Sequence, residues 1–360
     1  MKAAVVREFG QALTIEELDI AAPGVGEVSV EIKACAICHS DILYASGGWG
    51  GSLPAVYGHE AAGIVESVGP GVRHVSPGDH VVVTLVRSCG RCGCCEQGYY
   101  GSCEATFALD EQPPLRLKTD GSPVVQGLRT AAFAERTVVD ASQAVSISKS
   151  VPFASASLLA CGVITGFGAV INTAQVRAGS SVAVIGTGGV GLNSIQGASI
   201  SGARRVIAID VNADKLETAL RLGASDGIDA SGTDAVARVR ELTDGRGADY
   251  VFVTVGAKPA FAQAYAMLAK GGAAVIVGMA PVGVMSEFDP LTLAGDSQRI
   301  LGSKMGASNI HRDIPKLVEL YQQGRLKLDE LITARYRLDE INDAIAAVQS
   351  GSALRNVIVF

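Results

Sequence analysis

Five of the chain's eight cysteines fall within one short run, and four of the five are regularly spaced. Cys89, Cys92, Cys95 and Cys103 form the pattern C-x2-C-x2-C-x7-C, and Cys94 lies inside the run but outside its spacing. Thiolates two residues apart can face one ion, and a fourth thiolate from a following loop can complete a tetrahedron. Four thiolates with no open position are typical of a structural zinc site. An iron–sulfur cluster is the alternative, but no second redox motif accompanies the run.

Three distant segments hold a second group of side chains that can bind a metal. They are Cys38-His39-Ser40-Asp41, Gly58-His59-Glu60 and Leu159-Ala160-Cys161-Gly162. Two thiolates and one imidazole, from Cys38, Cys161 and His59, leave a fourth position open, which is typical of a catalytic zinc site. Each residue alone is ambiguous, because an isolated cysteine or histidine is more often an ordinary structural residue.

A glycine-rich turn follows the apolar segment 181–185, which reads as a buried strand. The turn is Gly186-Thr187-Gly188-Gly189-Val190-Gly191, and a helix through Ser201 is expected after it. Glycines permit the tight turn and a close approach of backbone to a pyrophosphate, and a helix N-terminus favours negative charge. The pattern predicts a dinucleotide site. The alternative is a glycine-rich turn of another α/β fold.

Asp210 ends the next predicted strand, 206–210, roughly 20 residues beyond the turn. A carboxylate at this position accepts hydrogen bonds from the ribose hydroxyls of NAD and repels the 2′-phosphate of NADP. The residue after it is Val211, which supplies no positive charge for that phosphate. Arg204 and Arg205 lie nearby and keep NADP as an alternative.

The elements that must position these residues change character near residue 150. Before it, short β-prone segments recur at 28–32, 64–68 and 81–83. After it, apolar strands alternate with amphipathic helical segments, as in a parallel sheet covered by helices. The predicted strands are 182–185, 206–209, 250–255 and 274–277, and the predicted helices include 214–222 and 261–270. The sequence therefore predicts an α/β protein with a β-rich domain and a Rossmann domain.

Length and composition limit the possible classes of protein. The 360 residues suit two domains, and 48% hydrophobic against 18% charged residues argues against disorder. A net charge of −6 argues against a general nucleic-acid role. No stretch reads as a membrane span, and the N-terminus is too charged for a signal peptide, so we expect a cytoplasmic protein without membrane partners. In that compartment the cysteines favour metal binding over disulfides.

Taken together, these motifs resemble the zinc-containing medium-chain alcohol dehydrogenases. The segment 112–135 and the C-terminus are most similar to the dimeric, liver-type branch of that family. The segment Gly58–Gly63 with Gly69 and Val72 fits the family signature, and the other motifs, through Leu354–Phe360, follow in the family's order. The resemblance implies a GroES-like β-rich catalytic domain over 1–162 and 305–360, with a zinc lobe near 89–103. It implies a Rossmann domain over 163–304.

The resemblance also implies roles for the metal-binding and catalytic residues. Cys38, His59 and Cys161 would hold a catalytic zinc, and the four-cysteine lobe a structural zinc. Ser40 would take the substrate hydroxyl proton. Asp41 would orient His59, Glu60 would lie behind the metal, and Trp49 and Leu85 would line the substrate pocket.

A further set of residues would hold NAD. Thr165 and Val190 would press the nicotinamide ring toward the substrate, Asp210 and Lys215 would contact the adenosine ribose, and Arg355 would approach the pyrophosphate. The full set implied by the resemblance is His39, Thr165, Gly186, Gly188, Gly189, Val190, Gly191, Asp210, Lys215 and Arg355.

Two positions depart from the liver-type pattern. His39 stands where that branch often has an arginine on the pyrophosphate, so cofactor binding is expected to be weaker and pH-dependent. Leu43 stands where the branch has the histidine that receives the relayed proton. Ser40 must then pass its proton to the ribose hydroxyl and water, or to a base that the sequence does not identify.

The expected activity is NAD-linked oxidation of an alcohol to an aldehyde or ketone. A primary alcohol is expected, and Trp49 favours one that is bulky or aromatic. The sequence does not determine the physiological substrate. Glutathione-linked formaldehyde oxidation, polyol oxidation and a non-catalytic zinc- and nucleotide-binding redox sensor are the alternatives. Residues 47–51 supply no acid for a charged glutathione adduct. A homodimer is expected, with a tetramer as the other possibility.

Overall fold

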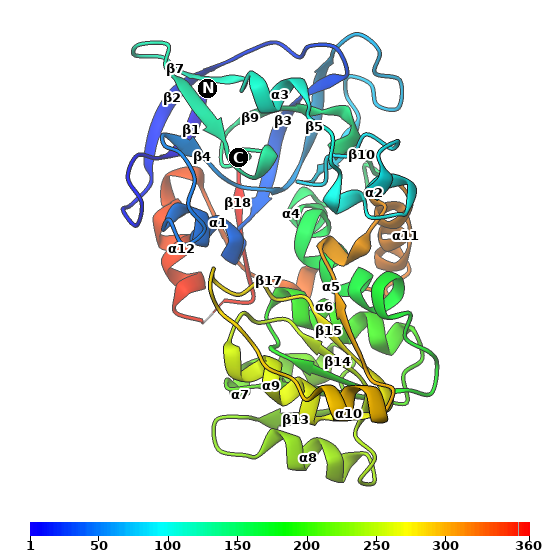
Figure 1. The fold of residues 1–360 in the computed structure, drawn as a ribbon. Coiled ribbons are helices and arrows are strands. Elements are labelled where there is room, and N and C mark those ends of the chain that lie inside the picture. The colour runs from blue at the N-terminus through cyan, green and yellow to red at the C-terminus, as the bar shows by residue number, and fades with distance from the viewer. Residues whose placement is uncertain (352) are drawn as a thin grey trace. The chain divides into compact units, whose positions relative to one another are not determined.

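The computed structural model describes residues 1–351 and 353–360, which form two compact units (Figure 1). The first comprises Met1–Gly162 and Asn309–Phe360, and the second Val163–Ser308. The expected boundary assigned residues 305–308 to the β-rich part instead. They belong to the second unit because Gly306 and Ser308 pack on helix α5 (Ile164–Gly168). A Cβ at Gly306 would lie 2.1 Å from the carbonyl oxygen of Ile164, and Ser308 donates a hydrogen bond to that oxygen.

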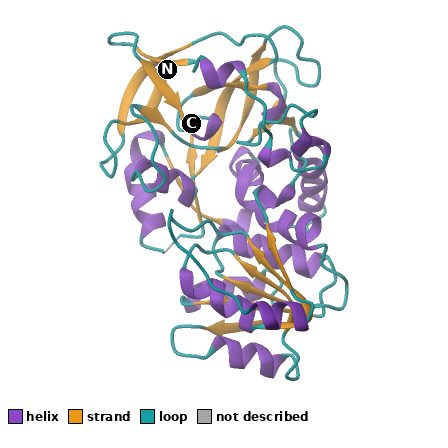
Figure 2. Ribbon diagram, viewed as in Figure 1, coloured by secondary structure: helices purple, strands orange, loops and turns teal. Residues whose placement is uncertain are grey.

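The first unit is rich in strands (Figure 2). A closed barrel has the order β1-β2-β7-β8-β4, and a seven-stranded sheet has the order β10-β6-β5-β3-β18-β17, with β9 paired to β3. The barrel strands are Lys2–Val6 (β1), Thr14–Ile20 (β2), Ala55–Val56 (β4), Leu115–Leu117 (β7) and Pro123–Gln126 (β8). The sheet strands are Glu27–Ala36 (β3), Glu60–Val68 (β5), His80–Val83 (β6), Arg136–Asp140 (β9), Ala144–Ser146 (β10), Ile332–Tyr336 (β17) and Arg355–Val359 (β18).

Short helices connect these strands, and their apolar faces join the strand core. Val30, Ile32, Val65 and Ile358 are buried in that core together with Ile341 of α12. The α-helices of the unit are His39–Ala45 (α1), Gly93–Glu96 (α2), Ala108–Glu111 (α3), Phe153–Leu158 (α4), Ile310–Gln322 (α11) and Ile341–Gln349 (α12).

The second unit is a six-stranded parallel sheet flanked by helices. Its order, β13-β12-β11-β14-β15-β16, is the 3-2-1-4-5-6 order of the Rossmann fold, so the order reverses between β11 and β14. The strands are Ser181–Ile185 (β11), Arg205–Asp210 (β12), Asp226–Asp229 (β13), Ala248–Val253 (β14), Leu268–Ile276 (β15) and Arg299–Gly302 (β16). The other helices are Gly189–Ile200 (α6), Ala213–Arg221 (α7), Ala235–Leu242 (α8), Lys258–Ala266 (α9) and Pro290–Gly295 (α10).

The helix expected at 261–270 ends earlier than its pattern suggested. Helix α9 stops at Ala266, and β15 begins at Leu268. Leu268 pairs with Ala248 at the start of β14, so sheet formation overrides the helical pattern of the last residues.

One helical run is long and apolar enough to span a membrane by length and composition. It covers Phe153–Ala174, 22 residues whose most apolar window has a mean hydropathy of 1.9. The expectation that no such stretch exists is therefore wrong. Inside the protein 89% of that window is buried, which is the environment of a core helix.

The glycine turn between β11 and α6 requires glycine for steric reasons. Gly186 has a φ of +92°, and a Cβ at Gly191 would lie 1.8 Å from the carbonyl oxygen of Gly186. Gly188 has an ordinary negative φ, and a Cβ there would meet nothing within 4 Å. The third glycine of the pattern therefore allows the helix to pack closely on its own strand.

We expect Gly191→Ala to lower the free energy of unfolding by about 2 kcal/mol or more, because backbone atoms cannot move aside without shifting α6. Gly188→Ala is the matched control and should change it by less than about 1 kcal/mol. Urea unfolding followed by circular dichroism measures both. Equal losses in the two variants would contradict this account of the turn.

Candidate functional site

Three strand ends of the first unit meet at one end of its sheet. Ala36 at the end of β3 pairs with Glu60 at the start of β5 and with Val357 of β18. Cys38 follows β3 and precedes α1, while His59 directly precedes β5. This register brings residues that are hundreds of positions apart in sequence to the same edge.

A buried cluster forms at this edge. Ligand atoms of Cys38, His59, Glu60 and Cys161 all lie within 4.8 Å of one another. Cys161 comes from the helical turn Leu159–Val163 after α4. His59 and Glu60 are 0% exposed, Cys161 6% and Cys38 8%. The structure thus brings together the three expected metal ligands and adds a carboxylate oxygen beside them.

The imidazole of His59 is oriented for a metal. Its Nδ1 is 2.9 Å from Oδ1 of Asp41, and Asp41 also accepts hydrogen bonds from the backbone N–H groups of Cys38 and Gly58. The buried Nε2 of His59 has no hydrogen-bond partner among the described residues. A carboxylate on one ring nitrogen fixes the tautomer and leaves the other nitrogen as a donor to a metal. The donor set therefore fits a zinc ion.

The side chains of this cluster shift the pKa values of one another. The thiol of Cys161, and then the imidazole of His59, hold the pKa of Cys38 well below its usual range. Contact with Cys38 and burial raise the pKa of Cys161. Burial alone would lower the pKa of His59, but the charge of Asp41 raises it well above the usual value. One thiolate is thus already favoured within the cluster.

Glu60 and Arg355 form a buried ion pair beside these ligands. Their side chains are 0% and 6% exposed, and the backbone N–H of Gly162 lies 3.5 Å from Oε2 of Glu60. Burial raises the pKa of Glu60 to about 7, although Arg355 opposes the shift. The guanidinium of Arg355 therefore faces Glu60 in this structure. Its expected approach to a pyrophosphate stays a prediction.

Helix α1 carries the expected relay and substrate residues. Ser40 is half-buried and His39 is exposed. The side chain of Leu43 packs against the backbone of Gly48, where an added Cβ would lie 3.3 Å from Cδ2 of Leu43. Leu85 and Trp49 are both half-buried. The roles that the resemblance implies for these residues stay predictions.

Sequence reasoning missed an aromatic group around Trp49. The rings of Tyr44 and Trp49 meet edge to face at 5.2 Å, and Tyr57 stacks on Tyr44 at 5.8 Å. Burial raises the pKa of Tyr57. The signal was available, because Tyr57 lies two residues before His59 and Tyr44 lies on α1, but no spacing rule joins the two segments.

The four cysteines of the lobe also converge. Sulfur atoms of Cys89, Cys92, Cys95 and Cys103 lie within 4.8 Å of one another, whereas Cys94 is outside the cluster. The backbone N–H groups of Glu104 and Cys95 lower the pKa of Cys92 to about 6, and burial raises that of Cys95 to about 12.

No disulfide forms among the eight cysteines, all of which lie in the described part of the chain. Cys92 and Cys103 are 3.9 Å apart at sulfur, too far for an S–S bond. Four thiols around one point, without a disulfide, fit a tetrahedral zinc ion.

The glycine turn of the second unit is tied to the end of β12. Oδ2 of Asp210 accepts hydrogen bonds from the backbone N–H and the hydroxyl of Thr187, at 2.6 and 2.9 Å. Its Oδ1 accepts from the N–H of Asn212 at 3.0 Å. A carboxylate can accept about four hydrogen bonds, so Asp210 can also accept one from a ribose hydroxyl. The hydrogen bonds of Thr187 to Asp210 were not predicted, because the glycine pattern gives the residue at position 187 no role.

Thr165, Val190 and Lys215, which are also expected to hold NAD, belong to the same unit, whereas His39 and Arg355 belong to the first unit. Helix α5 approaches α6 so closely that a Cβ at Gly166 would lie 2.1 Å from the carbonyl oxygen of Val190, which brings Thr165 into the neighbourhood of Val190. Lys215 is half-buried in the first turn of α7, after Asp210.

A Rossmann sheet joined in one chain to a barrel unit with a cysteine–histidine cluster defines a zinc-dependent dehydrogenase. The family model for the alcohol dehydrogenase GroES-like domain matches residues 24–149, and that for zinc-binding dehydrogenase matches 189–323. The chain belongs to the zinc-containing medium-chain alcohol dehydrogenases, and it is an oxidoreductase that acts on a small molecule. This confirms the predicted family and fold class.

Similar proteins cover almost the whole chain. A putative alcohol dehydrogenase D of Mycobacterium tuberculosis is 37% identical, over 99% of both chains. A probable S-(hydroxymethyl)glutathione dehydrogenase 1 of Schizosaccharomyces pombe is 39% identical, over 99% of this chain and 96% of its own. The crystal structure of benzyl alcohol dehydrogenase from Acinetobacter calcoaceticus has a TM-score of 0.93 and 32% identity, over 100% of this chain and 99% of that one.

We expect Arg355→Met to destabilise the fold by about 3 kcal/mol, because it leaves Glu60 buried without its counter-charge. Adding Glu60→Gln should restore at least about 1 kcal/mol, since the second change removes the unpaired charge. Arg337→Met is the control, because Arg337 is 73% exposed in its pair with Asp339 and should matter by less than about 0.5 kcal/mol.

Urea unfolding at constant zinc concentration measures the three variants. A double variant as unstable as the sum of its single changes would contradict the coupling between Glu60 and Arg355.

Proposed function

We propose that this protein oxidises primary alcohols, aromatic ones in particular, and transfers the hydride to NAD. The observation that carries the proposal is the buried cluster of Cys38, His59 and Cys161, with a free imidazole nitrogen aimed into it. In this proposal the unit with that cluster is the catalytic domain, and the Rossmann unit binds the dinucleotide.

Cys38, His59 and Cys161 would hold the catalytic zinc, which when bound lowers the pKa of an alcohol as it does that of water. Asp41 keeps the His59 ring in place through Nδ1. Glu60, paired with Arg355, supplies a negative charge behind the ligands. Ser40, two residues after Cys38 on α1, would take the hydroxyl proton. Because Leu43 stands in place of the relay histidine, Ser40 would release that proton to the ribose hydroxyl and water, or to another base.

NAD is the proposed dinucleotide. Gly186 and Gly191 permit the tight turn and the close packing of α6, Gly188 leaves open space at the start of α6, and Gly189 begins that helix. Asp210 would place a carboxylate at the ribose position. Thr165, Val190, Lys215, His39 and Arg355 complete the proposed set. His39 is exposed, which suits a contact with a bound phosphate.

A second zinc ion, structural in role, is proposed for the four-cysteine lobe. The thiolate ligands also support a cytoplasmic location, where reduced cysteines persist.

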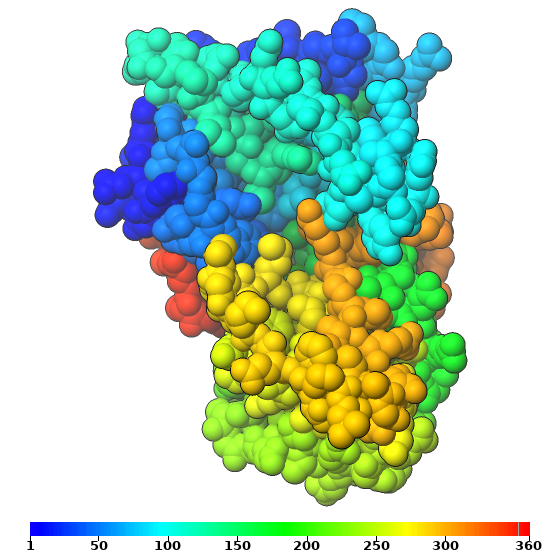
Figure 3. Space-filling view, viewed as in Figure 1, coloured from blue at the N-terminus to red at the C-terminus, as the bar shows by residue number. Residues whose placement is uncertain are grey.

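A homodimer is proposed as well. Met279, Val282, Met285 and Leu291 are between 64% and 86% exposed, and Figure 3 shows their part of the chain, coloured yellow to orange, at the surface of its unit. They precede β16, one of the two edge strands of the described parallel sheet, and an edge strand can pair with a second copy of the chain. Light scattering gives the mass in solution and separates dimer from tetramer.

We expect Cys161→Ala to lose about one equivalent of zinc and nearly all activity while its unfolding midpoint stays close to the parent value. Cys92→Ser should also lose about one equivalent, but its main effect should be a lower unfolding midpoint, because the lobe loses its cross-link. Metal analysis, thermal unfolding and turnover distinguish the two. Full zinc content and turnover in Cys161→Ala would contradict the ligand assignment.

We expect Asp210→Asn to lower the preference for NAD over NADP by about tenfold or more, or about 1.4 kcal/mol, because it removes the charge that repels a 2′-phosphate. Asparagine keeps an oxygen for the Thr187 hydrogen bonds, so the glycine turn should hold. The ratio of kcat/KM values for the two cofactors measures the effect. An unchanged ratio of kcat/KM values would mean that a residue other than Asp210 contacts the ribose.

Initial rates of NAD reduction with ethanol, benzyl alcohol, a polyol and S-(hydroxymethyl)glutathione test the proposed activity. We expect benzyl alcohol to be preferred, and chelation to abolish turnover. Trp49→Ala should lower kcat/KM for benzyl alcohol far more than for ethanol, since the aromatic group formed with Tyr44 is lost. Trp49→Phe should keep most of the preference.

Other outcomes of the same panel would identify the alternatives. Preference for the glutathione adduct would match the name of the S. pombe relative, and preference for the polyol would place the chain among polyol dehydrogenases. No turnover despite bound zinc and NAD would favour a redox sensor.

A further inference from the structure

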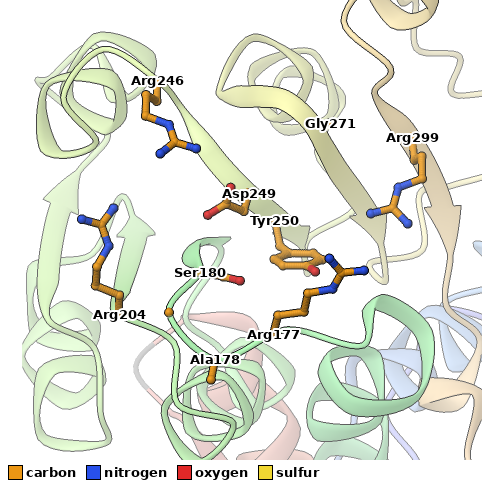
Figure 4. Close-up of a pocket in the computed structure, with 10 residues that line it drawn as sticks. Arg177, Ala178, Ser180, Arg204, Arg246, Asp249, Tyr250, Gly271 and Arg299 are labelled. Carbon is orange, nitrogen blue, oxygen red and sulfur yellow. The ribbon is translucent and has the colours of Figure 1, made fainter.

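The amino edge of the Rossmann sheet carries a hollow that the proposed dehydrogenase activity does not use. Its volume is about 670 Å³, and it lies where β11, β14 and β16 begin. The residues that line it include Arg177, Arg204, Arg246 and Arg299, together with Asp249 and Tyr250 (Figure 4). The four arginines come from four separate segments of the chain.

The charge of this hollow is strongly unbalanced. Four guanidiniums face one carboxylate, a surplus of three positive charges, on a chain whose net charge is −6. Asp249 accepts a hydrogen bond from the backbone N–H of Ser181 at 2.7 Å. None of the four arginines forms an ion pair within the described part of the chain, although other exposed arginines, such as Arg238 with Glu241, do.

The arrangement of the guanidiniums indicates the shape of a ligand. In Figure 4, Arg204 and Arg246 lie on one side of Asp249 and Tyr250, and Arg177 and Arg299 lie on the other. The only side-chain hydrogen bond of these guanidiniums in the described residues is from Arg204 to the hydroxyl of Ser181, at 3.3 Å. Guanidinium groups bind phosphate oxygens through paired N–H donors, so this arrangement suits two or more linked anionic groups.

We propose that this hollow binds a small anion with two or more linked phosphate groups. Such an anion carries about three or four negative charges at neutral pH, because each phosphate adds between one and two. It would neutralise the surplus of three, whereas a single phosphate or a dicarboxylate would not.

The proposed site is distinct from the dinucleotide site. The glycine turn follows the carboxyl end of β11, whereas the hollow lies at its amino end, and a strand of five residues spans roughly 16 Å. A phosphate ligand at the glycine turn would therefore not reach the four arginines.

The test is calorimetric titration of the zinc-loaded full chain with sodium tripolyphosphate at constant ionic strength. We expect saturable binding that weakens as salt is raised. Arg246→Gln/Arg299→Gln removes one guanidinium from each side and should lower the affinity by about tenfold or more. The control is Arg221→Gln/Arg238→Gln, which removes the same charge from α7 and α8 of the same unit and should bind like the parent. Basal activity should be unchanged in both variants.

Three results would overturn the proposal: equal binding by both double variants, equally tight binding of citrate, or displacement of tripolyphosphate by NADH. The comparison of variants holds even if NADH does not bind, so a failure of the proposed activity is a separate result. Titration with ATP in place of tripolyphosphate shows whether the site recognises a free phosphate chain or a nucleotide. Equal affinities mean that the phosphate chain alone is recognised, and tighter binding of ATP means a nucleotide.

Discussion

The structure of the first unit depends on the pairing of charges that are almost completely removed from water. The carboxyl group of Glu60 and the guanidinium of Arg355 lie beside two thiols and an imidazole, and none of these side chains is more than 8% exposed. An isolated charge in such a place costs several kcal/mol, so each group here is tolerable only because of its neighbours. Asp41 meets His59, and Arg355 meets Glu60.

This requirement explains why the end of the chain returns to the first sheet. Arg355 opens β18, which pairs with β3, and β3 pairs with β5 at the residue next to His59. The strand register therefore determines which side chains share the buried edge. A shift of one residue in β18 would turn Arg355 to the other face and leave Glu60 alone. The backbone hydrogen bonds of three strands thus fix the position of one counter-charge.

Local patterns in the sequence predicted the parts of the sites that depend on short spacing. The lobe cysteines span fifteen positions, and the glycine turn six, so their geometry is largely set by the chain between them. The alternation of strands and helices predicted the Rossmann domain. The strand order could not be predicted, because hydrophobic periodicity does not indicate which strands pair. Periodicity also misplaced the end of α9, where pairing of Leu268 in β15 prevailed.

The contacts that escaped prediction join residues with no sequence relation. The clamp of Thr187 on Asp210 and the aromatic group of Tyr44, Trp49 and Tyr57 are of this kind. For Glu60 and Arg355, the resemblance implied separate roles, at the metal and at the pyrophosphate, but not their ion pair.

The two cysteine clusters stabilise a thiolate under opposite conditions. In the lobe, backbone N–H groups lower the pKa of Cys92, and three of the four cysteines are half-exposed, so water and the backbone can stabilise a thiolate. At the buried edge, a thiolate of Cys38 depends on side chains, first on Cys161 and then on His59. The lobe cysteines therefore lie within one local loop, whereas the cysteines at the buried edge depend on side chains from separate elements. The first cluster is suited to holding a loop together, and the second to holding reactive groups that water does not reach.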